Sequence, residues 1–181
     1  MDRNQRSLFT HRKISEEDLE MILEWRNSEA VRVYMFESDV IPMENHRKWF
    51  QKLGEDRKCW LLFYKNEPAG VFYKYLRDKE KDIWIWGCYL GDPGIVKHLG
   101  TCMGLIAQEC FFEEEKVKTV IGEMVASNDR SRKFNLNLGF RIEHDLTITT
   151  SKGEEIPAVY LELHQDEWLK KKPELFEKYF A

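Results

Sequence analysis

The stretch Glu123–Phe140, EMVASNDRSRKFNLNLGF, constrains the fold of this chain more than any other. It continues a run of apolar, β-favouring residues, and its Ser127 and Asn128 then offer the short side-chain oxygens that cap a helix N-terminus. A short helix is predicted over Arg130–Leu138, followed by Gly139 where a left-handed C-cap is needed. The pattern predicts a strand, a short capped helix and then a new extended run.

Three consecutive segments give the strongest strand signals. They are Lys58–Lys65, Gly70–Leu76 and Ile83–Leu90, which are rich in aromatic and branched residues. A turn at Asn66–Pro68 separates the first two, and the charged stretch Asp78–Asp82 separates the last two. Short turns between such runs predict an antiparallel meander.

The remaining segments alternate between helical and extended patterns. In chain order they are an edge strand at Ser7–Ile14, a helix capped by Ser15, a short helix at Glu29–Tyr34, a helix at Met43–Leu53, a long helix ending near Glu115, a strand at Val117–Ala126, a hairpin of Phe140–Ile148 and Ile156–Leu163, and an amphipathic helix at Asp166–Phe180 that is kinked or restarted at Pro173. Together with the meander, this order predicts a mixed α+β fold with one central sheet flanked by helices.

Length and composition limit the class of protein. At 181 residues the chain suits one domain, over residues 1–181, with a substantial core. Its net charge of −4 argues against a protein that binds nucleic acid by neutralising phosphates, and no apolar run is long enough to span a membrane. The four cysteines lack zinc-ligand spacing, so reduced thiols in a cytoplasmic protein are expected.

The closing motif and the order of elements resemble the GNAT-type N-acetyltransferases, over essentially the whole chain. The resemblance implies the GNAT (acyl-CoA N-acyltransferase) fold, with a mostly antiparallel mixed sheet, and acetyl-CoA bound between the strand and the helix of the motif. It also implies that the loop before the long helix wraps the cofactor pyrophosphate at the positive end of a helix dipole. That loop keeps Gly94, Lys97 and Gly100, but not the spacing typical of the family.

The same resemblance implies further contacts with acetyl-CoA. Asn128 and Phe134 of the closing motif are expected on the cofactor. The oxyanion of the reaction would be met by a backbone amide of the third meander strand, near Cys88, Tyr89 and Leu90.

Shorter fragments are similar to one branch of the family, the sugar-nucleotide N-acetyltransferases of pseudaminic acid biosynthesis. The fragments are Leu23–Asn27, Tyr34-Met35, His46 before a helix, Gly87–Tyr89 and Glu123–Phe140. This likeness implies acetylation of the 4-amino group of a UDP-linked 4-amino-4,6-dideoxy-N-acetyl-altrosamine. The residues it implies on the nucleotide are Arg26, the Met35 backbone, His46 and Tyr89. The aromatic meander, including Tyr73 and Tyr75, could stack the uracil ring.

Direct acetyl transfer needs a base for the amine proton, stabilisation of the oxyanion and a way for the thiolate to leave. Glu123 lies on the strand that flanks the cofactor and is the predicted base, acting through water. Where the family usually has a tyrosine that protonates the thiolate, this chain has Asn135, which cannot supply a proton. The thiolate then leaves unprotonated, or water or another group such as Tyr73, Tyr75 or Tyr89 serves instead, or the protein is a weak or inactive relative.

Each of these residues also has an interpretation without a role in the reaction. Arg26 could pack its stem on the core or form an internal ion pair, and His46 could be a surface or capping residue. Glu123 could be a solvated carboxylate paired with a lysine. Cys88 has no histidine or aspartate at a spacing typical of a nucleophile, so a buried thiol is expected.

Three functions compete. The first is an acetyl-CoA-dependent N-acetyltransferase for a small-molecule amine, a UDP-amino-sugar, with no metal, no nucleic-acid partner and no membrane, and with a homodimer left open. The second is an acetyltransferase for peptide or ribosomal-protein α-amines, which shares the leading helices and the Glu167-Trp168 tail. The third is a non-catalytic acyl-CoA-binding module, suggested by the altered loop and Asn135, although Glu123 and Arg26 argue against it.

Overall fold

The computed structural model describes residues 5–91 and 98–180. Within them seven strands form one sheet in the order β1-β2-β3-β4-β5-β7-β6. The strands are β1 (Phe9–Lys13), β2 (Arg57–Tyr64), β3 (Glu67–Asp78), β4 (Ile83–Leu90), β5 (Thr119–Val125), β6 (Arg141–Thr149) and β7 (Glu155–His164). All neighbours are antiparallel except β4 and β5, which are parallel. The predicted α+β fold with a mostly antiparallel mixed sheet is confirmed.

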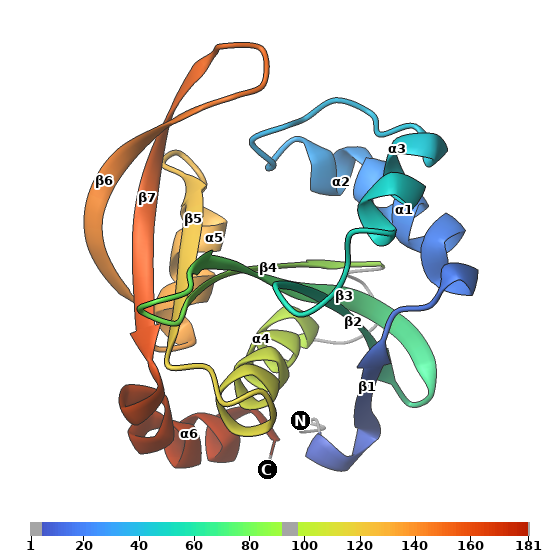
Figure 1. The fold of residues 1–181 in the computed structure, drawn as a ribbon. Helices are drawn as coiled ribbons and strands as arrows, with labels where there is room; N and C mark the ends of the chain where they lie inside the picture. Colours follow the sequence, from blue (N-terminus) through green and yellow to red (C-terminus); the bar gives the residue numbers. More distant parts are fainter. Residues whose placement is uncertain (1–4, 92–97, 181) are drawn as a thin grey trace.

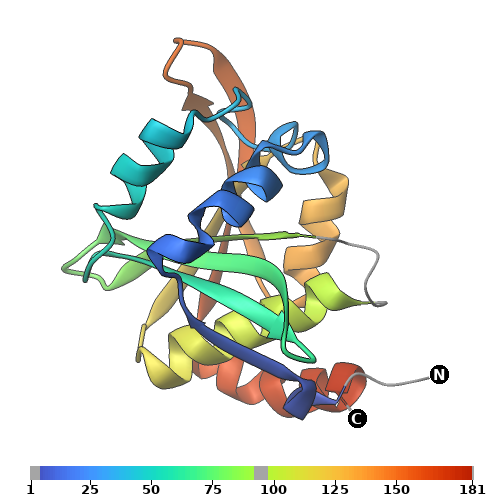
Figure 2. The same ribbon diagram turned by 90° about the vertical axis from the view of Figure 1, so that its right-hand side faces the viewer.

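Helices cover both faces of this sheet (Figures 1 and 2). They are α1 (Leu19–Asn27), α2 (Glu29–Arg32), α3 (Met43–Phe50), α4 (Leu99–Glu109), α5 (Asp129–Asn137) and α6 (Gln165–Phe180), with a π-helical turn at Cys110–Glu114 and 3-10 turns at Arg6–Leu8 and Glu16–Asp18. In Figure 1, α1–α3 lie above β2–β4 and α4 lies below them. We call these two sides the upper and lower faces. The register of β4 with β5 and of β5 with β7 shows which side chains of β5 and β7 belong to each face.

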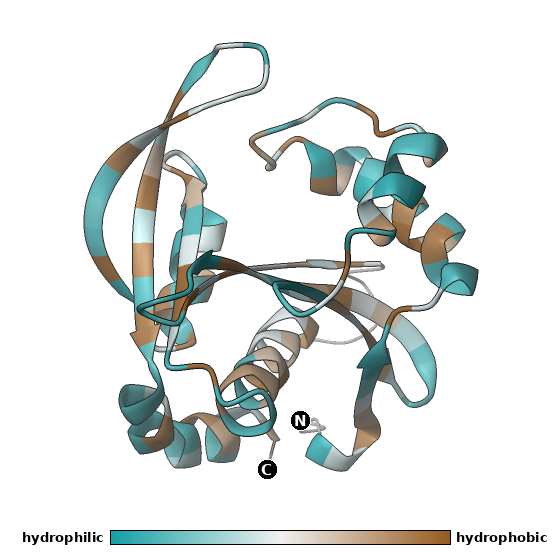
Figure 3. Ribbon diagram, viewed as in Figure 1, coloured by the Kyte–Doolittle hydropathy of each residue, from teal (hydrophilic) through white to brown (hydrophobic). Residues whose placement is uncertain are grey.

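The meander buries alternate side chains on the two faces. Trp60 and Phe72 belong to the larger core with α4 and α6, whereas Leu61 and Val71 belong to the smaller core with α1 and α3. Successive side chains of a strand point to opposite sides of the sheet. Because both odd and even positions are apolar here, both faces must be covered by other elements. Figure 3 shows α4 to be largely apolar, as a helix buried against the sheet should be.

Both ends of α5 match the sequence-based expectation. The Oδ1 atom of Asn128 accepts a hydrogen bond from the Ser131 N–H at 3.0 Å, which makes Asn128 the N-cap. Gly139 has a φ of +96° and ends the helix, and the Phe140 N–H donates to the Asn135 carbonyl at 3.1 Å. This is a Schellman motif, and it turns the chain from α5 into β6.

The predicted cap before α1 is also confirmed. The backbone N–H and the hydroxyl of Ser15 donate to Oδ2 of Asp18 at 2.7 and 3.1 Å. Arg12 donates two further hydrogen bonds to Asp18, at 2.7 and 2.9 Å. The hydrogen bond from Arg12 is the main reason why the pKa of Asp18 is lowered.

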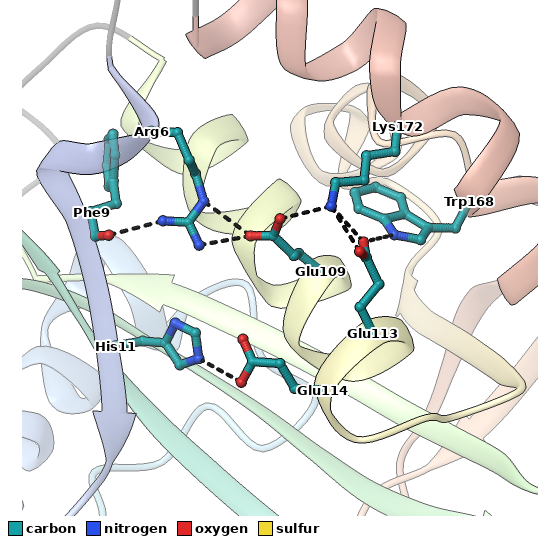
Figure 4. A network of polar contacts seen from close by, with 8 residues as sticks. All are labelled: Arg6, Phe9, His11, Glu109, Glu113, Glu114, Trp168 and Lys172. Carbon is teal, nitrogen blue, oxygen red and sulfur yellow. Dashed lines mark hydrogen bonds and ion pairs between the residues drawn. The ribbon is translucent and has the colours of Figure 1, made fainter.

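A network of charged groups closes the lower face and joins three segments (Figure 4). Arg6 pairs with Glu109 of α4 at 2.7 Å, and Lys172 of α6 pairs with the same carboxylate at 2.8 Å. Lys172 also pairs with Glu113 at 2.7 Å, and the Trp168 indole donates to Glu113 at 3.1 Å. The segment before β1 and the last helix are thereby held against α4.

Three elements differ from the expectation. The long helix is α-helical only to Glu109 and then continues as the π-helical turn, in which the Glu115 N–H donates to the Cys110 carbonyl at 2.9 Å. The short second helix ends at Arg32. Of the two alternatives for Pro173, a kink or a restart, the restart is wrong, because α6 continues through this residue. In residues 5–91 and 98–180, no helix has the length and apolar character that a membrane span needs.

Candidate functional site

β4 and β5 are paired over only three rows, and the last row joins Ile85 to Ile121. Beyond that row the two strands run apart, β4 with Trp86–Leu90 and β5 with Gly122–Val125 (Figure 1). We call this divergence the wedge. Because no described strand pairs with the facing edges there, their backbone amides and carbonyls are available to a ligand.

Two glycines let side chains approach the strands of the wedge. A Cβ atom on Gly122 would lie 3.6 Å from both the Asn135 Oδ1 and the Trp86 Nε1. A Cβ atom on Gly87 would lie 2.4 Å from the Tyr73 hydroxyl oxygen. Any larger residue at position 87 would therefore displace the Tyr73 ring from the β4 backbone.

Glu123 follows Gly122 along β5 and points to the upper face. Its side chain is only 13% exposed, and its one ion-pair partner among the described residues is Arg77, whose Nη2 lies 4.0 Å away. No described residue donates a hydrogen bond to the Glu123 carboxylate. It is neither fully solvated nor paired with a lysine of the described chain. A sheltered carboxylate with so little pairing is suited to receive donors from a ligand.

Two tyrosine hydroxyls lie close to Glu123. Burial raises the pKa of Tyr75, and the charge of Glu123 raises it further. The pKa of Tyr160 is raised to about 12, by burial first, then by Glu162 and to a smaller extent by Glu123. Both hydroxyls are therefore protonated at neutral pH, and each can take part in hydrogen bonds next to the carboxylate.

The three tyrosines expected at the substrate share the upper face. The rings of Tyr73 and Tyr75 are stacked, with centroids 6.5 Å apart, and burial raises the pKa of Tyr73 and of Tyr89. Their hydroxyls form no hydrogen bond with any residue that the structure describes. A groove of about 400 Å³ opens beside Tyr75, lined also by Lys52, Gly54, Glu55, Asp56, Arg57 and Leu76. This face thus offers aromatic surface and hydroxyls that are available to a ligand.

Arg26 and His46 are brought together on this face with Tyr73 and Tyr89. The charge of Arg26 lowers the pKa of both tyrosines to some extent, and the pKa of His46 is lowered by burial and then by Arg26. The Arg26 Nη2 donates to the Glu37 carbonyl at 2.9 Å, whereas its Nη1 is buried and has no partner in the described chain. His46 is 4% exposed, so it is not a surface residue, and its Nε2 also lacks a described partner.

The loop between α2 and α3 contains Met35 and reaches the tip of the β6–β7 hairpin (Figure 2). The Met35 N–H is used within the loop, because it donates to a carbonyl of α2 at 3.1 Å. Glu37 accepts hydrogen bonds from the N–H and the hydroxyl of Ser151 at 2.7 and 2.9 Å, and Lys152 pairs with Asp39 at 2.6 Å. Two segments far apart in the sequence therefore meet at this end of the upper face.

Asn135, expected to replace the usual tyrosine, approaches the wedge from the lower side. Its Nδ2 donates to the carbonyl of Ser131 at 2.9 Å, one turn back along α5. Its Oδ1 is buried without a described partner and faces Gly122. Asn135 thus presents an acceptor to the wedge, and the structure does not bring it to the side of β5 that carries Glu123.

Other residues expected at the cofactor form the lower wall of the wedge. The ring of Phe134 packs against Trp86, with centroids 5.9 Å apart, and Cys88 and Leu90 contact the same core. Burial raises the pKa of Cys88 to about 12, so this thiol stays neutral and is no nucleophile. The Oδ1 of Asn128 is occupied by its capping hydrogen bond, which leaves its Nδ2 for other contacts.

The loop expected at the pyrophosphate is described only at its end. Gly100 lies in the first turn of α4, which begins at Leu99. Gly94 and Lys97 lie outside the described residues.

The sequence-based expectation missed the residues of β7 and β3 that surround Glu123. Tyr160 is the register partner of Glu123, Glu162 is the partner of Ile121, and Arg77 of β3 is the only described cation near the carboxylate. A signal was present, because polar residues alternate with Val159, Leu161 and Leu163 along β7. That alternation puts one polar row on the upper face.

One group of side chains outside this site has the composition of a metal site. The donor atoms of His11, Cys110 and Glu114 all lie within 4.8 Å of one another on the lower face. Lys74 is near enough to lower the pKa of the Cys110 thiol, whose pKa burial otherwise raises, and it pairs with Glu115 at 3.4 Å. A cation at this position would face the ammonium of Lys74, which opposes metal binding.

Comparisons with known proteins agree with this geometry. A family model described as an acetyltransferase (GNAT) domain matches residues 9–141. The fold is similar to that of the Vibrio cholerae spermidine N-acetyltransferase in complex with CoA and spermine, with a TM-score of 0.79 at 14% identity over 90% of this chain and 99% of that chain. It is also similar to the aminoglycoside acetyltransferase AAC(6')-Ib in complex with coenzyme A and kanamycin, with a TM-score of 0.75 at 21% identity over 91% of this chain and 99% of that chain. No curated protein matches the sequence.

Proposed function

The chain belongs to the acetyltransferase (GNAT) family, and we propose that the group it acetylates is the 4-amino group of a UDP-linked amino-sugar. It is an N-acetyltransferase that uses acetyl-CoA. The proposal for the acceptor rests on two groups of the upper face. Glu123 is a carboxylate that no described residue donates to, and Arg26 has a buried guanidinium nitrogen without a described partner. An acceptor with an amine at one end and a diphosphate at the other would satisfy both.

The residues of the wedge fit acetyl-CoA, which supplies an activated acetyl group. The unpaired edges of Trp86–Leu90 and Gly122–Val125 can hydrogen-bond an amide-containing chain, and a backbone amide near Cys88–Leu90 can meet the oxyanion. Phe134 and the Nδ2 of Asn128 would contact the cofactor from α5, and the first turn of α4 at Gly100 favours phosphate through its helix dipole.

Glu123 is proposed to take the proton of the acceptor ammonium, directly or through one water. Removing that proton frees the nitrogen lone pair for attack on the acetyl carbon. The carboxylate is suited to this role because Arg77, at 4.0 Å, is too distant to occupy it as a hydrogen-bond donor.

Arg26 and His46 are proposed to bind the nucleotide. Guanidinium groups match phosphate oxygens in geometry and charge. The buried Nη1 of Arg26 and Nε2 of His46 both lack described partners, so a polar ligand would remove a cost that the free protein bears. A polyamine such as spermidine would instead meet the positive charge of Arg26.

Tyr73 is the best-supported donor of the proton that the departing thiolate needs. Its hydroxyl lies against the backbone of Gly87 in the wedge, on the strand that is proposed to flank the thioester. Asn135 offers no proton, and its Nδ2 is occupied by Ser131. Tyr73→Phe is therefore expected to slow turnover more than Tyr75→Phe.

The substrate is tested by mass spectrometry of reactions with acetyl-CoA and four acceptors: a UDP-linked 4-amino-sugar, spermidine, kanamycin and a peptide with a free N-terminus. Acetylation confined to the UDP-amino-sugar is expected. Acetylation of only spermidine, kanamycin or the peptide would overturn the proposed acceptor while keeping the reaction. A parallel calorimetric titration with acetyl-CoA separates an inactive protein that binds the cofactor from one that does not bind it.

A further inference from the structure

We propose that Tyr160 orients the acceptor amine by accepting a hydrogen bond from it. Glu162, held by His164, accepts the proton of the Tyr160 hydroxyl, so the oxygen of that hydroxyl faces the amine as an acceptor. The inference rests on the proposed role of Glu123 as the site of the amine. It adds a residue that selects primary amines, on a strand outside the closing motif.

Tyr160 stands beside Glu123 across two paired strands. The register of β5 with β7 places Glu123 directly opposite Tyr160, and both lie in the row that faces the upper side. Side chains that are opposite in an antiparallel pair have Cβ atoms about 5 Å apart. The ring of His144 stacks on the Tyr160 ring, with centroids 4.6 Å apart and planes 16° apart, which fixes the plane of the phenol.

The Tyr160 hydroxyl uses its one proton in a chain of hydrogen bonds along β7. That hydroxyl donates to Oε2 of Glu162 at 3.3 Å, and Oε1 of Glu162 lies 2.5 Å from Nε2 of His164. The Nδ1 of His164 lies 3.1 Å from Oγ1 of Thr119. The Tyr160 contact is long, but the Tyr160 hydroxyl is its donor and the Glu162 carboxylate its acceptor, so the hydroxyl proton points along β7.

A tyrosine whose only proton is committed presents lone pairs alone to a ligand. The upper face at Glu123 therefore offers two acceptors close together, the carboxylate and the Tyr160 oxygen. A protonated primary amine gives one proton to Glu123 and keeps two N–H groups and a lone pair. If Tyr160 accepts one of these N–H groups, the rotation of the amine is restricted and the lone pair has a defined direction.

The protons of the whole reaction balance in this arrangement. The first proton of the ammonium passes to Glu123 and then to solvent, and the nitrogen forms its bond to the acetyl carbon. When the carbon–sulfur bond breaks, a second proton passes from the nitrogen to Glu123, which has released the first to solvent. The Tyr73 hydroxyl gives its proton to the thiolate and is reprotonated by solvent. The N–H held by Tyr160 is the one that remains in the amide product.

The arrangement predicts selection against acceptors with fewer N–H groups. An N-methylated amine, once deprotonated, has a single N–H, and that proton must leave the nitrogen when the amide forms, so no N–H remains for Tyr160 to hold. A site built around a hydrogen bond rejects an analogue that lacks it, here by roughly 10-fold to 100-fold. Tyr160→Phe removes this acceptor while keeping the ring and its stacking on His144.

The experiment compares kcat/KM for a primary amine and for its N-methyl derivative in wild type, Tyr160→Phe and Glu162→Gln. The amine is whichever of the UDP-amino-sugar, spermidine or kanamycin the wild type acetylates. Tyr179→Phe on α6 and the exposed Glu143→Gln on β6 are the matched controls. Tyr160→Phe is expected to lose most of the preference for the primary amine, about tenfold, with an unchanged KM for acetyl-CoA. Glu162→Gln is expected to lose part of it.

The outcomes separate this inference from the proposed function. An unchanged preference in Tyr160→Phe, in a variant with a wild-type melting temperature, would overturn the role of Tyr160. An equal loss in Tyr179→Phe would overturn it as well, because that change lies on the opposite face. Full activity of Glu123→Gln, or no acetylation of any of the three amines, would overturn the proposed function on which the inference stands.

Discussion

The two faces of the sheet treat their charged groups differently. On the lower face Glu109 contacts Arg6 and Lys172, and Glu115 contacts Lys58 and Lys74. On the upper face Arg77, at 4.0 Å, is the only ion-pair partner that Glu123 has within residues 5–91 and 98–180. The Nη1 of Arg26 and the Nε2 of His46 are buried there without described partners.

The difference separates groups that hold the fold from groups that await a ligand. A buried charge with hydrogen-bonded partners repays part of its desolvation, whereas one without them is a cost that a protein retains only where function requires it. We therefore expect substitutions on the lower face to change stability, and substitutions on the upper face to change acetyl transfer. Gln108 of α4 breaks this pattern, because its side-chain amide is fully buried and has no partner in the described chain.

The largest effect is expected for Glu123→Gln. Loss of the base should lower kcat by about 100-fold or more, because a positioned general base contributes on that scale. The free energy of unfolding should be unchanged or slightly higher, since the carboxylate has almost no pairing to lose. Steady-state kinetics and urea unfolding of one preparation measure both, with the exposed Glu80→Gln as control. Wild-type kcat, or a marked loss of stability, would contradict the distinction between the faces.

Glu115→Gln should have the opposite profile. Lys74 is 1% exposed and its ammonium lies 3.7 Å from the centroid of the Trp84 ring, so it depends on Glu115 for a countercharge. The variant should lower the free energy of unfolding by about 2–3 kcal/mol and leave kcat unchanged. The double variant with Lys74→Met should recover most of that loss in urea unfolding. No recovery would mean that the Lys74–Glu115 pair is not the cause.

Arg26→Gln tests the unpaired guanidinium. We expect the KM of the UDP-amino-sugar to rise about tenfold, which corresponds to losing a charged hydrogen bond, while the KM of acetyl-CoA stays the same. Steady-state kinetics with each substrate varied in turn measures this. Equal increases in both KM values would indicate a general disturbance of the upper face.

Gln108→Leu should stabilise the protein. Replacing a buried amide that has no described partner by an apolar side chain of similar size removes a desolvation cost, so the free energy of unfolding should rise by about 1 kcal/mol. The comparison is again urea unfolding. A destabilised variant would contradict this expectation.

Asp18→Asn tests whether a charged group contributes to stability because it is paired or because of the face on which it lies. Asp18 lies on the side of α1, yet Arg12 and Ser15 hold it, so the variant should lose about 1 kcal/mol of stability at pH 7. The pKa of Asp18 is lowered in the fold by the Arg12 hydrogen bond, so its contribution is present above the unfolded pKa of about 3.9 and is lost as the pH falls through the folded value. Unfolding at pH 7 and at pH 3 should therefore show a difference that shrinks in acid. A constant difference would contradict the assignment.

Much of the fold could be predicted because local patterns agreed with one another. The meander, the Asn128 cap and the Gly139 stop each follow from short-range chemistry, and their order pointed to the family. Arg26 was noticed in the sequence because a charge on an apolar helix stripe needs a reason. Its lack of an ion pair could not be predicted, because pairing depends on segments that meet only in three dimensions.

The candidate site shows the same limit. Glu123 could be identified from its place on β5, but its near isolation is a property of the neighbours that β3 and β7 bring to it. The contact between Glu37 and Ser151, 114 positions apart, has no local signal. The π-helical turn after Glu109 was also unexpected, since its residues are ordinary helix formers.

The most direct test is a crystal structure of the protein with coenzyme A and the UDP-linked 4-amino-sugar. We expect the thiol to lie between Trp86–Leu90 and Gly122–Val125. The sugar amine should lie within hydrogen-bonding reach of Glu123, directly or through one water, with the diphosphate at Arg26. An amine bound on the lower face, or a coenzyme that lies outside the wedge, would contradict it.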